Sequence, residues 1–163
     1  MTILLKNKHT LQIEDFKFRC SVGKKGLSKI KKEGDLKTPR GNFKIEHLYF
    51  RKDRLNKPIT RLKCIEIKKN MCWCDDPLSK KYNKLIKINN NIKNEKLFRN
   101  DTKYDLLVPI KYNFNKIIPH KGSCIFLHLT KDYKPTKGCI ALIKKDFLIL
   151  LKLINKKSKI KII

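Results

Sequence analysis

The sequence contains no run of about eighteen apolar residues, which excludes an ordinary membrane-spanning helix. Its first stretch, Met1–Leu11, has only a three-residue apolar run before Lys6, too short for the apolar region of a secretory signal. No internal repeat and no domain boundary is visible. We therefore expect one domain over residues 1–163, which is long enough to bury a core, and a cytoplasmic location stays open.

Acidic residues are scarce, with 14 Asp and Glu against 41 Lys and Arg, so the formal net charge is +27. Such a charge is typical of proteins that bind a polyanion, whether nucleic acid, anionic lipid or an acidic cell-wall polymer. The basic residues are scattered along the whole chain, however, rather than gathered in one tail or stripe. This scatter favours a general compositional bias over a specific nucleic-acid site.

The cysteines do not form the framework of a small secreted disulfide protein. Six are present: Cys20, Cys64, Cys72, Cys74, Cys124 and Cys139. Cys72 and Cys74 stand two apart, but no second pair with zinc-ligand spacing follows. A zinc site made by these two with His120 or Cys124 is one alternative. Cys139 differs from the others because a glycine precedes it at a turn.

Short segments of alternating apolar and polar residues predict a mostly-β sandwich or barrel. The expected strands are Thr2–Leu5, Thr10–Ile13, Phe16–Val22, Phe43–Tyr49, Arg61–Ile67, Tyr104–Ile110, Ser123–Leu129 and Lys159–Ile163. Helical spacing of apolar residues over Lys144–Ile154 predicts one C-terminal helix packed on the core. A short irregular helix is expected within Pro77–Asn94, and Pro109 predicts an edge or a bend for its strand. Gly23–Gly41 is expected to form a long loop over the site.

A histidine and a cysteine near the end of the chain form a candidate catalytic pair. Ten residues lie between His128, at the end of an apolar strand, and Cys139, at a turn. A thiol needs a base to become a good nucleophile at neutral pH, and histidine titrates in that range. Gly138 would let a substrate carbonyl approach the backbone, where N–H groups could form an oxyanion hole.

Three neighbouring residues have a functional and a structural interpretation each. Thr136 either orients the site through its hydroxyl or caps the turn. Lys137 either favours the thiolate through its charge or is a solvated surface lysine. Trp73, the only tryptophan, is either a substrate wall or a core anchor, and the second is favoured because large aromatic side chains mostly pack.

The stretch from His128 through Thr136-Lys137-Gly138-Cys139 resembles the active-site signature of the YkuD-type L,D-transpeptidases, a histidine followed by Ser/Thr-x-Gly-Cys. The segment Thr38–Phe43 is similar to the Thr-Pro-x-Gly-x-Phe element of that family. Further counterparts in a compact bacterial branch are Gly34-Asp35, Trp73–Pro77, Tyr82-Asn83, Tyr104–Leu106, Gly122-Ser123 and Phe126–His128. The resemblance covers nearly the whole chain.

The resemblance implies a β-rich catalytic domain that acts on peptidoglycan stem peptides in the cell envelope, as a monomer and without cofactor or metal ion. Cys139 would be the nucleophile and His128 the general base and acid. Gly138 would supply the oxyanion hole, and Thr136 would orient the site. Residues with an implied substrate-binding role are Lys137, Ser123, Gly122, Trp73, Tyr82 and Arg40.

The sequence also departs from the better-known members. Lys137 replaces a histidine, Ala141 and Leu142 replace an Arg or Asn, and seven residues form a shortened spacer before Thr136. The acceptor therefore stays open between cross-linking to a second stem, hydrolysis, D-amino-acid exchange and attachment to a protein or glycan. A non-catalytic basic domain that binds an anionic polymer is a further alternative.

Overall fold

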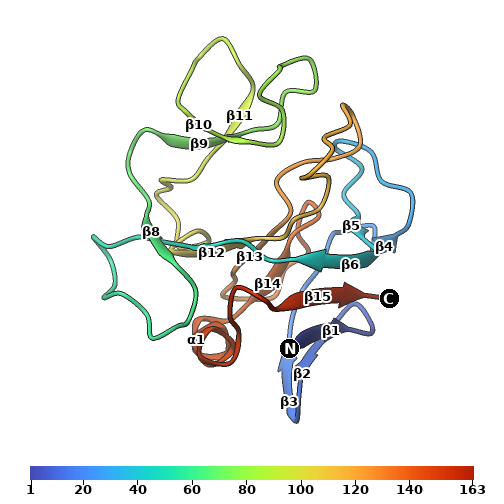
Figure 1. Cartoon of the computed structure of the whole chain (residues 1–163), viewed down its shortest axis with the longest axis vertical. Coiled ribbons are helices and arrows are strands. Elements are labelled where there is room, and N and C mark those ends of the chain that lie inside the picture. The colour runs from blue at the N-terminus through green and yellow to red at the C-terminus, as the bar shows by residue number, and fades with distance from the viewer.

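The computed structural model describes all residues 1–163 and shows four β-sheets and one helix (Figure 1). The terminal sheet contains β3 (Phe16–Arg19), β2 (Thr10–Ile13), β1 (Thr2–Leu5), β15 (Lys159–Ile162) and β6 (Gly41–Lys44), in that order. The central sheet contains β14 (Ile140–Leu142), β13 (Phe126–Leu129), β12 (Leu106–Pro109), β7 (Leu48–Phe50) and β8 (Cys64–Glu66). The small sheet contains β10 (Leu85–Lys87), β9 (Met71–Cys74) and β11 (Asn94–Lys96). A two-stranded sheet pairs β4 (Leu27–Ser28) with β5 (Thr38–Pro39), and the helix is α1 (Lys144–Leu153).

The terminal sheet joins the two ends of the chain. Strand β15 pairs with β1 in parallel and with β6 antiparallel, so the C-terminal strand lies inside the sheet. Its alternating pattern turns Ile160 and Ile162 into the core and leaves Lys159 and Lys161 exposed. The period-two pattern of this segment therefore has the expected physical cause, one buried and one solvated face.

The central sheet is buried on both faces. One face and the terminal sheet enclose the main hydrophobic core, to which α1 contributes Phe147, Leu150 and Leu151. The other face carries Leu107 and Phe126, which pack with Trp73 from the small sheet in a second apolar cluster. Complete burial of such side chains contributes roughly 1.5–3 kcal/mol each. The sheets do not close on themselves, so the predicted mostly-β fold with one C-terminal helix is confirmed as a sandwich.

Three details of the predicted elements were wrong. The segment 43–49 divides, because residue Ile45 bridges Ile110 where the chain passes from β6 in the terminal sheet to β7 in the central sheet. The segment 77–94 forms turns and β10 rather than a helix. Pro109 ends β12, the middle strand of the central sheet, so its predicted place on an edge strand is wrong; it is tolerated there because pairing with β7 stops at Leu107.

The helix α1 lacks the length and the apolar character that crossing a membrane would require.

Candidate active site

Cys139 and His128 lie on the same face of two paired strands. Strands β13 and β14 run in parallel, with His128 opposite Ala141 and Leu127 opposite Ile140. Cys139, directly before β14, is next to Phe126, whose N–H donates to the Cys139 Sγ at 3.4 Å. Because side chains alternate along strands, Phe126, His128 and Cys139 all face the small sheet. The register of this one strand pair therefore places the two predicted residues on one face of the central sheet.

The Cys139 thiol is held in a resting position. Its Sγ donates a hydrogen bond to the Cys124 carbonyl at 3.1 Å, and its side chain is buried in the second apolar cluster. Burial raises the pKa of the Cys139 thiol to about 12; the Phe126 N–H and the Lys31 ammonium lower it, and the Glu95 carboxylate raises it further. The resting thiol is therefore protonated at neutral pH.

The His128 ring is also neutral in this state. Its Nδ1 lies 2.8 Å from the Leu129 carbonyl, which accepts only, so Nδ1 carries the proton and Nε2 has the free lone pair. Burial lowers the pKa of His128 to about 4, although the bond to Leu129 opposes this shift. A neutral imidazole with a free Nε2 is the form that can accept a proton from a thiol.

Sequence reasoning missed a polar chain that closes the site on the His128 side. The Tyr104 ring packs edge to face against His128, with centroids 5.5 Å apart. Its hydroxyl donates to Glu95 Oε1 at 3.1 Å, and Arg99 pairs with the same carboxylate at 3.2 Å. Glu95 and Arg99 were overlooked because they come from β11 and the segment after it, which have no recognisable motif.

The turn before Cys139 requires glycine. Gly138 has φ of +145°, and a Cβ atom there would lie 2.9 Å from the Lys37 carbonyl oxygen. The Thr136 hydroxyl accepts the Gly138 N–H at 3.0 Å and donates to the Cys139 carbonyl at 2.7 Å. Thr136 thus bonds to both ends of the turn. In the resting state the Gly138 N–H is therefore already bonded to the Thr136 hydroxyl.

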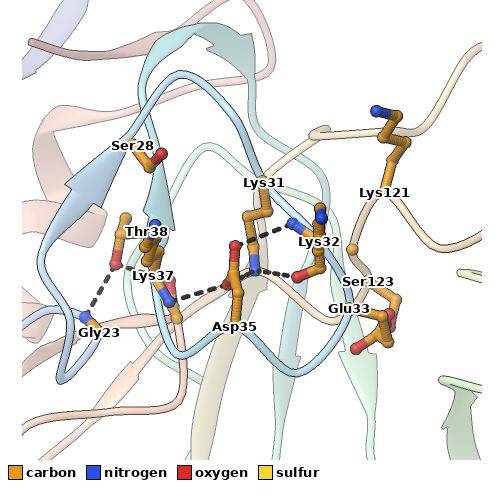
Figure 2. Close-up of polar contacts among 12 residues, drawn as sticks. Gly23, Ser28, Lys31, Lys32, Glu33, Asp35, Lys37, Thr38, Lys121 and Ser123 are labelled. Atoms are coloured by element: carbon orange, nitrogen blue, oxygen red, sulfur yellow. Dashed lines mark hydrogen bonds and ion pairs between the residues drawn. The ribbon is translucent and has the colours of Figure 1, made fainter.

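The predicted long loop Gly23–Gly41 contacts this turn directly. The fully buried Thr38 accepts the Gly23 N–H at 2.9 Å and donates to the Gly138 carbonyl at 2.8 Å. Figure 2 shows the Lys31 ammonium beside Asp35, at 2.6 Å, with the Lys32 carbonyl on its other side. The loop therefore places a buried ammonium close enough to Cys139 to act on the thiol pKa.

A second part of the loop contacts the segment before β13. The Ser123 hydroxyl donates to Glu33 Oε2 at 2.7 Å, and the Tyr82 hydroxyl donates to the same oxygen. Tyr82 also accepts the Gly122 N–H at 3.0 Å. Burial and the Glu33 carboxylate raise the pKa of Tyr82, so its hydroxyl stays protonated. Gly122, Ser123 and Tyr82 thus form one network, joined by Glu33, which sequence reasoning had not singled out.

The remaining predicted residues lie in different settings. Trp73 is 3% exposed and packs against Phe126 with ring centroids 5.3 Å apart, so it serves as a core anchor in this state. Arg40 and Lys137 are exposed, and neither side chain forms a hydrogen bond or ion pair. These two cations are free for a ligand.

Cys139 and His128 are both largely buried in the resting state, at 8% and 7% exposure. A hollow of about 660 Å³ lies over β10, and one of about 380 Å³ lies beside Trp73 and Phe114. Neither is lined by Cys139 or His128.

The residues of the alternative zinc site do not converge. The Cys72 thiol donates to the backbone carbonyl of Ile86, and the Cys74 thiol donates to the backbone carbonyl of Asp76. His120 is exposed on another segment. No group of three His, Cys, Asp or Glu side chains is arranged to hold a metal ion.

Comparison with known proteins identifies the family. The family model described as YkuD, L,D-transpeptidase catalytic domain, matches residues 1–162. The fold is similar to the helical cell shape determining protein Pgp2 from Campylobacter jejuni, with 17% identity and a TM-score of 0.53. A mutant of that protein gives 18% identity and a TM-score of 0.52. In both cases 99% of this chain aligns with 46% of the solved chain, so it spans about half their length. No curated protein matches.

Proposed function

Because the chain belongs to the YkuD family of L,D-transpeptidase catalytic domains, we propose that it is a cysteine acyltransferase acting on peptidoglycan stem peptides in the cell envelope. The observation that supports this most strongly is the pairing of β13 and β14. It puts the Cys139 thiol and a neutral His128 on one buried face. These are the two groups that acyl transfer through a thioester requires.

In the first half-reaction, the Cys139 thiol turns away from the Cys124 carbonyl and gives its proton to His128 Nε2. The thiolate attacks the carbonyl of the third stem residue, at the L-centre of the diamino acid. The tetrahedral oxyanion is stabilised by backbone N–H groups of the turn at Gly138 and Cys139, and the Gly138 N–H becomes available for this only when it leaves the Thr136 hydroxyl. The C–N bond then breaks, the proton on His128 passes to the leaving amine, D-Ala departs and a thioester remains.

In the second half-reaction, the amine of another stem attacks the thioester. His128 takes a proton from this amine, the C–S bond breaks, and the thiolate recovers the proton. The product is a 3-3 cross-link, and the enzyme returns to its starting state. If water replaces the amine, the same steps give a tripeptide stem by hydrolysis.

The substrate would bind along the exposed cations next to the turn. Arg40 and Lys137 are suited to carboxylates of the stem peptide because neither is engaged by a protein carboxylate. Gly122, Ser123 and Tyr82 would form the opposite wall, with Trp73 behind it. Thr136 would orient the nucleophile through its two bonds to the turn. The domain would act as a monomer without a cofactor.

The test is product analysis by liquid chromatography and mass spectrometry on tetrapeptide muropeptides. The wild type should release D-Ala and form 3-3 dimers, and Cys139→Ala and His128→Ala should form neither while remaining folded. Cys64→Ala is the matched control, because Cys64 lies on β8 outside the site. Full activity of Cys139→Ala would refute the proposal. Formation of the tripeptide without any dimer would show that the reaction is hydrolysis and not transpeptidation.

A further inference from the structure

Asn83 is a buried amide whose hydrogen-bonding capacity is fully used. Its backbone has φ of +56°, a left-handed conformation that asparagine tolerates better than most residues. Its Oδ1 accepts the Trp73 Nε1–H at 3.0 Å and the Cys124 N–H at 3.2 Å. Its Nδ2 donates to the carbonyls of Tyr112 and Asn113, at 3.1 and 2.8 Å.

One of these bonds leads directly to the thiol. Cys124 has φ of +53°, uncommon for a residue other than glycine, so an external contact is needed to hold its peptide orientation. Asn83 Oδ1 supplies that contact at the Cys124 N–H. The Cys124 carbonyl, at the other end of the same residue, accepts the Cys139 thiol at 3.1 Å. The orientation of the thiol thus depends on Asn83 through a single residue.

The neighbouring residues do not duplicate this contact. Tyr82 and Glu33 hold Gly122 and the Ser123 side chain, but neither bonds to Cys124. Asn113 is a second left-handed asparagine, with φ of +50°, and it bonds to the carbonyls of Ile118 and Gly122. Asn113 therefore offers a matched control: the same residue type and backbone conformation without the bond to Cys124.

We propose that Asn83 is a positioning residue for the Cys139 nucleophile. Its Oδ1 holds the Cys124 N–H together with the Trp73 indole N–H. It thereby fixes the residue whose carbonyl accepts the resting thiol and sets the position from which the thiol leaves to react. The inference rests on the proposed role of Cys139 as nucleophile. Its physical basis is that a small displacement of a reacting atom lowers the rate of turnover far more than it weakens substrate binding.

Asn83→Gly tests the proposal because glycine adopts positive φ without strain, so only the side-chain bonds are lost. We expect kcat to fall on the order of 10²-fold with KM nearly unchanged. The carbonyl bond favours the neutral thiol, so its loss should speed iodoacetamide modification of Cys139 at pH 8. A pKa lowered by about half a unit gives a roughly threefold faster rate. The fluorescence emission of Trp73, the only tryptophan, should shift as its indole N–H loses Asn83.

Asn113→Gly should leave kcat, the Cys139 modification rate and the Trp73 emission near their wild-type values at a similar thermal stability. Equal changes in both variants, or an unchanged kcat in folded Asn83→Gly, would overturn the positioning role. If Asn83→Gly does not fold, Asn83→Asp and Asn83→Leu replace it. Asn83→Asp keeps both acceptor bonds and should keep the wild-type Trp73 emission. Asn83→Leu loses both bonds, so a wild-type kcat in this variant would overturn the positioning role. Activity in Cys139→Ala would refute Cys139 as the nucleophile. This failure is distinguishable from failure of the Asn83 contact, because the Cys139 modification rate and the Trp73 emission report on that contact without turnover.

Discussion

Individual polar side chains decide the geometry of the turn before Cys139, and Thr38 is the clearest case. Its buried hydroxyl accepts the Gly23 N–H and donates to the Gly138 carbonyl, which lies 100 residues further along the chain than Thr38. Thr38→Val keeps the shape but leaves both groups unsatisfied, so unfolding free energy should fall by about 2 kcal/mol. Thr38→Ser should recover most of it. Urea denaturation of the three proteins measures this, and equal stability of Thr38→Val and wild type would contradict it.

The buried imidazole of His128 predicts a loss of stability in mild acid. Its pKa is about 4 when folded, against 6.5 in the unfolded chain. As pH falls from 6.5 towards 4, the unfolded chain takes up a proton that the folded protein refuses, so the folded state loses free energy. Between pH 7 and pH 5 the loss from this group is about 2 kcal/mol.

The measurement is the unfolding free energy at both pH values for wild type and His128→Gln. The glutamine variant should show a smaller difference between the two, by roughly the same amount. Identical pH dependence of the two proteins would mean that His128 is not held neutral by burial.

At the scale of elements, the loop Gly23–Gly41 contains one ion pair, Lys31 with Asp35, whose two members contribute differently to stability. Lys31 is 5% exposed, and Asp35 accepts its ammonium together with the N–H groups of Lys32 and Lys37. Asp35→Ala leaves the buried ammonium with only the Lys32 carbonyl and leaves the N–H groups of Lys32 and Lys37 without this acceptor, and should cost about 3 kcal/mol. Lys31→Met leaves a carboxylate that keeps its two N–H donors, and should cost about 1 kcal/mol or less.

Thermal unfolding of both variants, with the exposed Lys121→Met as a control, checks this order. A larger loss in Lys31→Met than in Asp35→Ala would show that the ammonium, and not the carboxylate, organises the loop.

The elements show what could be predicted from the sequence and what could not. Local patterns were sufficient for β1, β2, β15 and α1, whose apolar residues alternate or repeat on one face. They failed for Pro109 because the length of the neighbouring strand β7, not the proline itself, decides whether an N–H is needed. They failed for the segment 77–94 because pairing with β9 is a tertiary contact.

The site divides in the same way. The motif around Cys139, with its upstream His128, could be read from sequence because the two proposed catalytic residues belong to adjacent, closely spaced segments of the chain. Glu95 and Asn83 reach the site from the small sheet and its turns, so only the folded chain shows their contacts with Tyr104 and Cys124.

At the scale of the whole molecule, the charge of +27 works against compactness. Much of this charge is exposed lysine without a nearby carboxylate, as at Lys44 and Lys159, which lie opposite each other on β6 and β15. Like charges in this position repel. Screening by salt should therefore stabilise the protein, by about 1 kcal/mol or roughly 2–4 °C in Tm between 20 and 300 mM NaCl.

Calorimetry across this range of salt is the measurement. A Tm that stays constant or falls would mean that the positive charges are already balanced by contacts within the fold.

The central claim is that Cys139 forms a thioester with the substrate. Intact-mass spectrometry of the protein after brief exposure to a tetrapeptide stem, or to a carbapenem as an acylating analogue, tests it most directly. We predict an added mass equal to the acyl group, located on the peptide that contains Cys139 and absent in Cys139→Ala. No adduct on the folded wild-type protein, or the same adduct in Cys139→Ala, would contradict it.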